Sequence, residues 1–324
     1  MASKPHLRYI FTGGKGGVGK STSAAAIAQH FSSQGEETLL VSLDPVHSIS
    51  SLLGQDVKGG VIKKVDGADK LYAIEVETRD TVERYKVNIG RRIRDFLKWA
   101  DIPLDPKPFI EIAATNPAFE ESATFDKMID IMLDQGEKYD RIVFDTAAVA
   151  NAIRLIGLSK IYGLWLDRMI RSRQEALSLR VKLSFRKDKV LEEIKKDPLM
   201  ADLMSMNERF LKAKELMMDE DKTIFFFVTI PLALPIAVVK RFIGMVQKFD
   251  IPIGGVIVNQ VIPPEAVRAE KATEYIKNKF EEQKRYLEVI ERDLGELVRS
   301  HIPLYPLELV GLEAIKRVSQ DLFK

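Results

Sequence analysis

A glycine-rich run near the start of the chain has the residue types and the spacing needed to bind phosphate groups. Residues 14–22 read Gly-Lys-Gly-Gly-Val-Gly-Lys-Ser-Thr and fit the pattern G-x-x-x-x-G-K-[ST]. Glycines let backbone N–H groups converge on phosphate oxygens, Lys20 would neutralise phosphate charge, and Ser21 would offer a hydroxyl to Mg²⁺. We therefore predict a site for Mg-ATP made of Gly14, Gly16, Gly17, Val18, Gly19, Lys20, Ser21 and Thr22.

The elements that must position this loop are short apolar strands separated by helical patterns. Several of these runs are continuous Val, Ile, Leu and Phe rather than alternating, which suits strands that are covered on both faces. The glycine-rich loop lies between the first strand and a helical run over residues 24–31. We predict a doubly wound, mostly parallel α/β sheet of the P-loop NTPase type. Its expected strands are residues 7–12, 38–43, 71–76, 141–144, 224–229 and 255–259.

Two long, charged segments interrupt the alternation of strands and helices. Apolar residues at three- and four-residue steps predict amphipathic helices in both of them. We expect residues 80–126 and 157–221 to be inserted α-helical subdomains, and residues 1–79, 127–156 and 222–324 to form the nucleotide-binding core. The apolar helix faces are Val82, Tyr85, Ile89, Ile93 and Phe96 in the first insertion, and Leu203, Met206, Phe210, Ala213 and Met217 in the second.

Composition excludes several classes of site. The 324 residues include 49 basic and 47 acidic ones and no cysteine. A net charge of +2 gives no global attraction to nucleic acid or anionic membrane, and the absence of thiols rules out disulfides and thiolate metal sites. The N-terminus lacks the apolar core of a signal peptide, and the most apolar stretch, residues 224–239, is short for a bilayer span and contains two prolines. We expect a cytoplasmic protein with no nucleic-acid partner.

Lys15 makes the phosphate loop more specific, because a plain loop of this kind does not require a lysine there. The Lys-Gly-Gly-Val-Gly-Lys spacing resembles the deviant Walker A motif of the family that includes the arsenical-pump ATPase, the tail-anchored-protein targeting ATPase, MinD and ParA. The resemblance implies a homodimer in which Lys15 reaches the partner's nucleotide and adds positive charge at the departing phosphate. A solvent-facing loop lysine is the alternative.

Two further motifs resemble the arsenical-pump and targeting branch of this family. Residues 44–48, Asp-Pro-Val-His-Ser, are similar to its switch I, and the resemblance implies that Asp44 orients or deprotonates the attacking water. His47 is either a switch contact or a hydrogen-bonded structural histidine. Residues 145–147, Asp-Thr-Ala, match the start of switch II, where Asp145 would hold Mg²⁺ through water. Residues 148–151 then depart from the family's Pro-Thr-Gly-His, so the coupling of nucleotide state to the helical insertions stays open.

The resemblance extends over nearly the whole chain. Residues 116–121 are similar to the branch's Pro-Gly-x-Glu-Glu, and residues 302–308 to its C-terminal Pro-Leu-Leu-Pro-Glu-Glu. By position, Asn259 matches an asparagine that contacts adenine, although an asparagine that ends a strand is commonly a turn residue. The chain departs from the family at Leu232, where a glutamate is usual, and at Val310, where an arginine is expected.

The resemblance leaves the output of the ATPase open. A chain without cysteine cannot bind arsenite through thiolates or form the Cys-x-x-Cys zinc site of eukaryotic targeting factors, so an archaeal-type member without zinc fits best. We expect a chaperone-like factor that shields hydrophobic, tail-anchored segments and meets membranes only transiently through them. A MinD- or ParA-like positioning ATPase and a regulatory switch that docks one folded partner are the alternatives. The second insertion holds six of the ten methionines, which would adapt to apolar clients or fill a helical core: Met169, Met200, Met204, Met206, Met217 and Met218.

Overall fold

The computed structural model describes residues 6–44, 48–99, 103–115, 117–146, 198–268 and 273–324, with residues 164, 167–168, 171, 175 and 178–179 between them. The described strands form one eight-stranded sheet in the order β3-β4-β2-β5-β1-β6-β7-β8. Every pairing is parallel except that of β3 with β4. The strands are β1 (Tyr9–Gly14), β2 (Thr38–Ser42), β3 (Lys63–Lys64), β4 (Leu71–Glu75), β5 (Arg141–Asp145), β6 (Thr223–Thr229), β7 (Ile253–Val261) and β8 (Val298–Pro303).

The predicted doubly wound α/β fold is confirmed. All six expected strands are present, and each end lies within two residues of its predicted position, because each strand is a buried apolar run. Two strands were missed. The strand β3 is two residues long, antiparallel and charged, and β8 reads Val-Arg-Ser-His-Ile-Pro with few apolar residues, so neither has the apolar pattern of a buried parallel strand.

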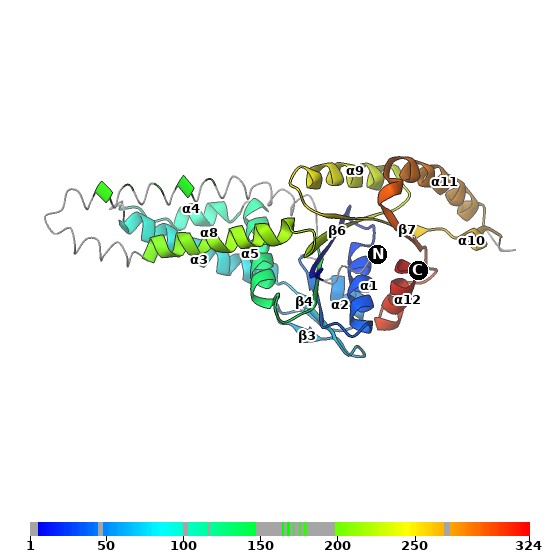
Figure 1. Ribbon diagram of the computed structural model, residues 1–324, viewed down its shortest axis with the longest axis horizontal. Helices are drawn as coiled ribbons and strands as arrows, with labels where there is room; N and C mark the ends of the chain where they lie inside the picture. The colour runs from blue at the N-terminus through cyan, green and yellow to red at the C-terminus, as the bar shows by residue number, and fades with distance from the viewer. Residues whose placement is uncertain are drawn as a thin grey trace. The chain divides into compact units, whose positions relative to one another are not determined.

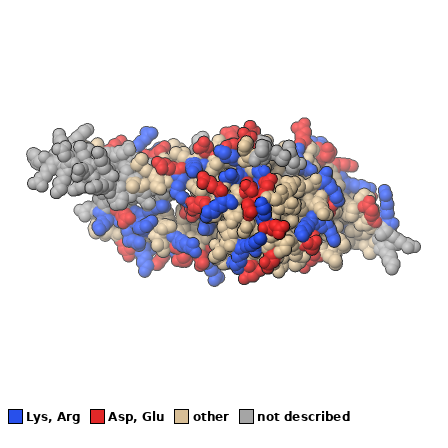
Figure 2. Space-filling view, turned by 60° about the horizontal axis from the view of Figure 1, so that its bottom comes forward, with Lys and Arg blue, Asp and Glu red and all other residues tan. Residues whose placement is uncertain are grey.

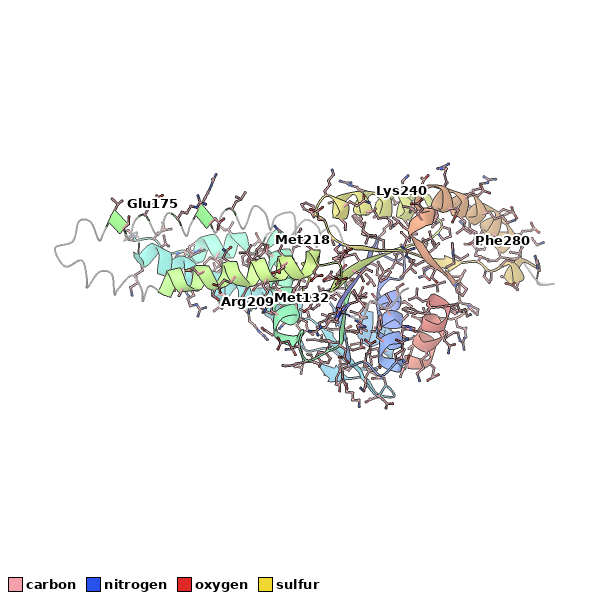
Figure 3. All side chains as sticks on the ribbon, in the orientation of Figure 1. Met132, Glu175, Arg209, Met218, Lys240 and Phe280 are labelled. Carbon is pink, nitrogen blue, oxygen red and sulfur yellow. The ribbon has the colours of Figure 1, made fainter. Side chains whose placement is uncertain are left out.

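Helices cover both faces of the sheet (Figure 1). On one face lie α1 (Lys20–Ser33), α2 (Ser48–Leu53) and α12 (Leu312–Leu322), and their apolar residues join those of the strands in one core. On the other face lie α9 (Ala233–Gln247) and α11 (Glu274–Leu294). The short α10 (Pro264–Arg268) precedes α11. In Figure 3 the labelled Lys240 belongs to α9, and its ammonium lies 2.6 Å from a carboxylate oxygen of Asp293 on α11.

The centre of the sheet is a stack of three aromatic rings. Phe11 of β1 lies with its ring centroid 4.7 Å from that of Phe144 on β5 and 4.4 Å from that of Phe225 on β6. The rings are nearly parallel, and all three side chains are fully buried. Such burial of large apolar area is the main stabilising contribution to a core. It fixes β1 between β5 and β6, and therefore fixes the loop that leaves β1.

The chain divides into two compact units. Residues 1–77, 130–153 and 216–324 form the unit that contains the sheet, and residues 78–129 and 154–215 form the second. The second unit contains α3 (Thr78–Trp99), α4 (Lys107–Ala113) and parts of α5 (Pro117–Gln135) and α8 (Pro198–Met218), the last two of which also contribute residues to the first unit. Among the described residues, no helix is long and apolar enough to cross a membrane.

The helical unit has an aromatic core of its own. Tyr85 of α3 lies edge-on to Phe119 of α5, with ring centroids 5.1 Å apart, and Phe125 of α5 lies 6.4 Å from Phe210 of α8. On α8 the apolar stripe predicted from sequence includes the buried residues Phe210, Ala213 and Met217. A periodic apolar face therefore packs inward on this helix, as helical periodicity requires.

Candidate nucleotide site

The phosphate loop connects β1 directly to α1. Gly17 and Gly19 have φ of 81° and 91°, a left-handed conformation that favours glycine. A Cβ on Gly14 would overlap the backbone of Val228 on the neighbouring strand, whereas one on Gly16 would meet nothing within 4 Å. No side chain caps the first turn of α1, whose N-cap is Gly19. The backbone N–H groups of the loop and of the helix N-terminus are therefore not blocked by a capping side chain, and this is the geometry that binds phosphate.

Lys20 and Ser21 open α1 at this loop. The side chain of Lys20 is buried, with 7% of its surface exposed. The hydroxyl oxygens of Ser21 and Ser48 lie 3.1 Å apart, which joins the start of α1 to the start of α2. A buried lysine followed in sequence by a hydroxyl residue provides groups suited to an anion and its cation.

Asp145 lies at the carboxyl end of β5, next to the loop. Its residue is fully buried, and within the described part of the chain neither carboxylate oxygen accepts a hydrogen bond of normal geometry. Burial raises the pKa of Asp145 to about 6, an effect that the nearby Ser21 hydroxyl and the Lys20 ammonium oppose. An ionised carboxylate without donors is costly in a protein interior. Asp145 therefore fits a hydrated Mg²⁺, whose charge and waters would satisfy it.

Asp44 is brought to the same place by the pairing of β2 with β5. Ser42 is in register with Asp145, and the next residue, Leu43, donates its N–H to the Asp145 carbonyl at 2.9 Å. The Asp44 N–H lies 3.4 Å from the Ser42 hydroxyl oxygen. The negative charge of Asp44 is near enough to raise the pKa of Asp145 further. The carboxyl ends of β1, β2 and β5 thus gather Lys20, Ser21 and both carboxylates in the crevice where α/β sheets bind ligands.

Asn259 lies against the phosphate loop from the other side. Its side-chain amide donates to the Val18 carbonyl at 2.9 Å, and its side-chain oxygen accepts the N–H of Gln260 at 2.9 Å. A Cβ on Gly19 would overlap the Asn259 amide nitrogen, so the two residues pack in direct contact. In this structure the Asn259 side chain is hydrogen-bonded to the backbone of the phosphate loop. One of its amide hydrogens is enough for the Val18 bond, which leaves the other for an acceptor on a ligand.

Comparison with known proteins agrees with this geometry. A family model described as anion-transporting ATPase matches residues 7–324. The chain belongs to the anion-transporting ATPase family. Two relatives from Arabidopsis thaliana, ATPase GET3B and ATPase GET3C, are 29% and 30% identical to it over the whole chain, which covers 80% and 84% of their lengths. A protein of Aquifex aeolicus (strain VF5) named putative arsenical pump-driving ATPase 2 is 27% identical over 98% of the chain and 99% of its own length.

Membership of the anion-transporting ATPase family confirms the family and the enzyme class predicted from the motifs. The chain is an ATPase of this family. Several switch predictions lie outside the described residues: His47 with its neighbours 45 and 46, and the divergent segment 148–151. Lys15 is described and is half-buried, while Gly16 and Gly17 next to it are exposed.

Three residues around the site were not predicted from sequence. Ser48 belongs to the switch I motif but had no role assigned, and only the structure shows its contact with Ser21. Glu75 ends an apolar strand and is completely buried, so a carboxylate inside an apolar run was the available signal. Gln283 is buried on a charged, amphipathic helix, and its neighbours in sequence give no indication of its role.

Proposed function

We propose that this ATPase acts as a homodimer whose nucleotide state controls the shielding and targeting of hydrophobic, tail-anchored membrane-protein segments in the cytoplasm. The observation that carries the proposal is the surface of the helical unit. It is the smaller of the two units, yet it holds half of the exposed large apolar side chains of the described chain: Val87, Leu104, Ile112, Leu164, Leu179, Met204 and Leu211. Exposed apolar groups on helices that interrupt an ATPase core suit an apolar helical ligand.

The proposed hydrolytic roles follow from chemistry at the carboxyl ends of the strands. Backbone N–H groups of residues 14–22 and the ammonium of Lys20 bind the phosphates. Ser21 and, through water, Asp145 would hold Mg²⁺, which would neutralise negative charge on the phosphate oxygens. Asp44 orients or deprotonates the attacking water. Lys15 adds an ammonium to the partner's site as charge develops on the leaving phosphate. Asn259 contacts adenine with the amide hydrogen that the Val18 bond leaves over.

The test is direct binding of an apolar helix. A fluorescent transmembrane-helix peptide is mixed with the purified protein without nucleotide or with ADP, and with the Asp44→Asn variant in the presence of ATP. Binding is followed by fluorescence anisotropy and site-specific crosslinking. We expect micromolar or tighter binding in one state and about a tenfold change between states. Binding in no state would remove the targeting function and leave the ATPase assignment intact.

A matched pair of variants locates the peptide. The triple change Val87→Asp, Ile112→Asp and Leu211→Asp places charges at exposed apolar positions of the helical unit, and should weaken binding about tenfold or more without altering basal hydrolysis. The control Val61→Asp alters an equally exposed apolar residue of the sheet-containing unit and should leave binding unchanged. Equal losses in both variants would place the peptide elsewhere.

The positioning-ATPase alternative requires nucleotide-dependent binding to membrane or DNA. Basic and acidic side chains are interspersed over the face shown in Figure 2, so that face offers no basic stripe among the described residues. Cosedimentation with anionic vesicles and with duplex DNA, with and without ATP, separates this alternative from peptide binding. The regulatory alternative predicts instead a stable complex with one folded protein.

A further inference from the structure

Glu75 is a carboxylate without any exposed surface, at the carboxyl end of β4. Both of its oxygens accept hydrogen bonds from one residue. Oε1 accepts the backbone N–H of Ser50 at 2.8 Å, and Oε2 accepts the Ser50 hydroxyl at 2.7 Å. Burying a carboxylate costs several kcal/mol unless hydrogen bonds compensate it. A buried carboxylate next to the proposed catalytic site therefore indicates a functional role in addition to packing.

Ser50 lies in the first turn of α2 and is held from two directions. While its hydroxyl donates to Glu75, the same oxygen accepts the N–H of Val57 at 3.1 Å. The backbone N–H of Glu75 in turn donates to the Val57 carbonyl at 3.2 Å. These bonds close a small network in which the start of α2, the chain that follows it and the end of β4 fix one another.

The first turn of α2 also contacts a residue of the proposed nucleotide site. Ser48, two residues before Ser50, lies 3.1 Å from the Ser21 hydroxyl. Asp44 precedes α2 by four residues and follows β2, whose Ser42 is in register with Glu75. The N–H of Val76 donates to the Ser42 carbonyl at 3.1 Å, so β4 also supports the end of β2. The end of β4 is thus hydrogen-bonded on both sides of Asp44, through Val76 to Ser42 before it and through Glu75 to Ser50 after it.

We propose that Glu75 is a positioning residue for ATP hydrolysis. By fixing Ser50, it holds the first turn of α2 so that Ser48 stays at Ser21 and Asp44 stays beside Asp145. In this proposal Glu75 acts through Ser50 and not by contact with the nucleotide. This inference rests on the proposed role of Asp44 in activating water, and it adds a named anchor for the switch I segment that the phosphate-binding motifs do not contain.

The first test separates turnover from binding. Glu75→Ala removes both hydrogen bonds to Ser50, whereas Ser50→Ala removes the hydroxyl bond with a small change in volume and keeps the backbone N–H bond. We expect kcat to fall about ten- to a hundredfold in both, with KM for ATP and Kd for ADP within about twofold of the parent. The double variant should lose no more turnover than Glu75→Ala alone, because Glu75→Ala already removes the hydroxyl bond between Ser50 and Glu75. Glu75→Gln keeps an acceptor for the Ser50 N–H and should recover much of the loss.

The control is Glu77→Ala. Glu77 lies two residues further on and accepts the N–H of Gly59 at 3.1 Å, outside α2. Its removal should leave kcat unchanged. Unchanged kcat in Ser50→Ala and Glu75→Ala, or losses that multiply in the double variant, would overturn the proposal.

A second readout does not depend on the role of Asp44. Hydrogen exchange of the peptide covering residues 44–57 should accelerate in Glu75→Ala and Ser50→Ala and stay unchanged in Glu77→Ala. Unaltered exchange in the first two variants contradicts the anchoring itself. Asp44→Asn is assayed in parallel, and parental turnover in that variant contradicts the proposed role of Asp44 while the exchange result still tests the anchor.

Discussion

At the scale of single residues, two glycines of the phosphate loop differ in whether the structure would accept a side chain. Gly19 has a left-handed backbone and packs on the Asn259 amide, whereas Gly16 has open space where a Cβ would be. Gly19→Ala should therefore lower the free energy of unfolding by about 1–3 kcal/mol and abolish nucleotide binding. Gly16→Ala should leave the melting temperature nearly unchanged. Thermal unfolding followed by circular dichroism checks both, and equal melting temperatures would contradict the packing described here.

Asp145 illustrates a conflict between stability and function at one residue. The pKa of Asp145 in the folded state, about 6, lies above the ordinary aspartate value of 3.8, so between these pH values the folded protein binds more protons than the unfolded one. Stability of the nucleotide-free protein consequently falls as the pH rises through this window and stays lower above it. Asp145→Asn should raise the free energy of unfolding by about 1–3 kcal/mol at pH 7.5, with no gain below pH 4, and should abolish Mg²⁺-dependent hydrolysis.

Urea unfolding at several pH values, in the presence of a chelator, measures this difference. Asp293→Asn is the control of opposite sign, because Arg292 and then Lys240 lower the pKa of Asp293 to about 2. Its carboxylate stabilises the folded state above its unfolded pKa, and this contribution is lost as the pH falls towards 2. If Asp145→Asn destabilises the protein at pH 7.5, the buried carboxylate of Asp145 is compensated by contacts other than those described.

At the scale of elements, the sequence predicted the strands whose positions are set by runs of hydrophobic residues. The strands that carry the site are continuous apolar runs, so their order in the chain and the position of Lys20, Asp44 and Asp145 after them followed directly. The contacts that tie these elements together did not follow. Glu75 and Ser50 are 25 residues apart and Asn259 and Val18 are 241 apart, and no local pattern specifies such pairs. The polar strand β8 was missed for a related reason, since its place at the sheet edge needs little apolar surface.

Gln283 of α11 shows how one helix supports the loop from a distance. Its side chain accepts the N–H of Ile262 at 2.9 Å and donates to the Ile262 carbonyl at 2.7 Å, three residues after Asn259. Gln283→Leu leaves both buried backbone groups without partners, which should cost about 2–4 kcal/mol in urea unfolding and weaken nucleotide binding several-fold. Glu281→Leu, on the same helix, removes only an exposed ion pair with Lys284 and should change neither by much. Equal nucleotide affinity in the two variants would mean that Asn259 holds its place without Gln283.

At the scale of the whole molecule, the two units place different requirements on the sequence. The sheet-containing unit carries its polar site groups at the carboxyl ends of strands whose buried centre includes the stacked rings of Phe11, Phe144 and Phe225. The helical unit combines a buried stripe, including Phe210 and Ala213, with exposed apolar side chains on the same helix, including Met204 and Leu211. A nucleotide-driven change in the second unit therefore needs a signal from the first. The proposed source is closure of a dimer around ATP, in which each chain completes the other's site.

The trans-acting role of Lys15 can be tested by mixing two inactive subunits. Lys15→Ala alone should bind ATP normally and hydrolyse it at least about tenfold more slowly, and Asp44→Asn should be similarly inactive. In a mixed dimer, the site of the Lys15→Ala subunit keeps Asp44 and receives Lys15 from its partner, so one site in two recovers. Random pairing of equal amounts should then restore about a quarter of the parental turnover. Sedimentation with a non-hydrolysable triphosphate confirms that mixed dimers form. If they form without any recovery, or if Lys15→Ala alone turns over at the parental rate, the lysine does not act across the interface.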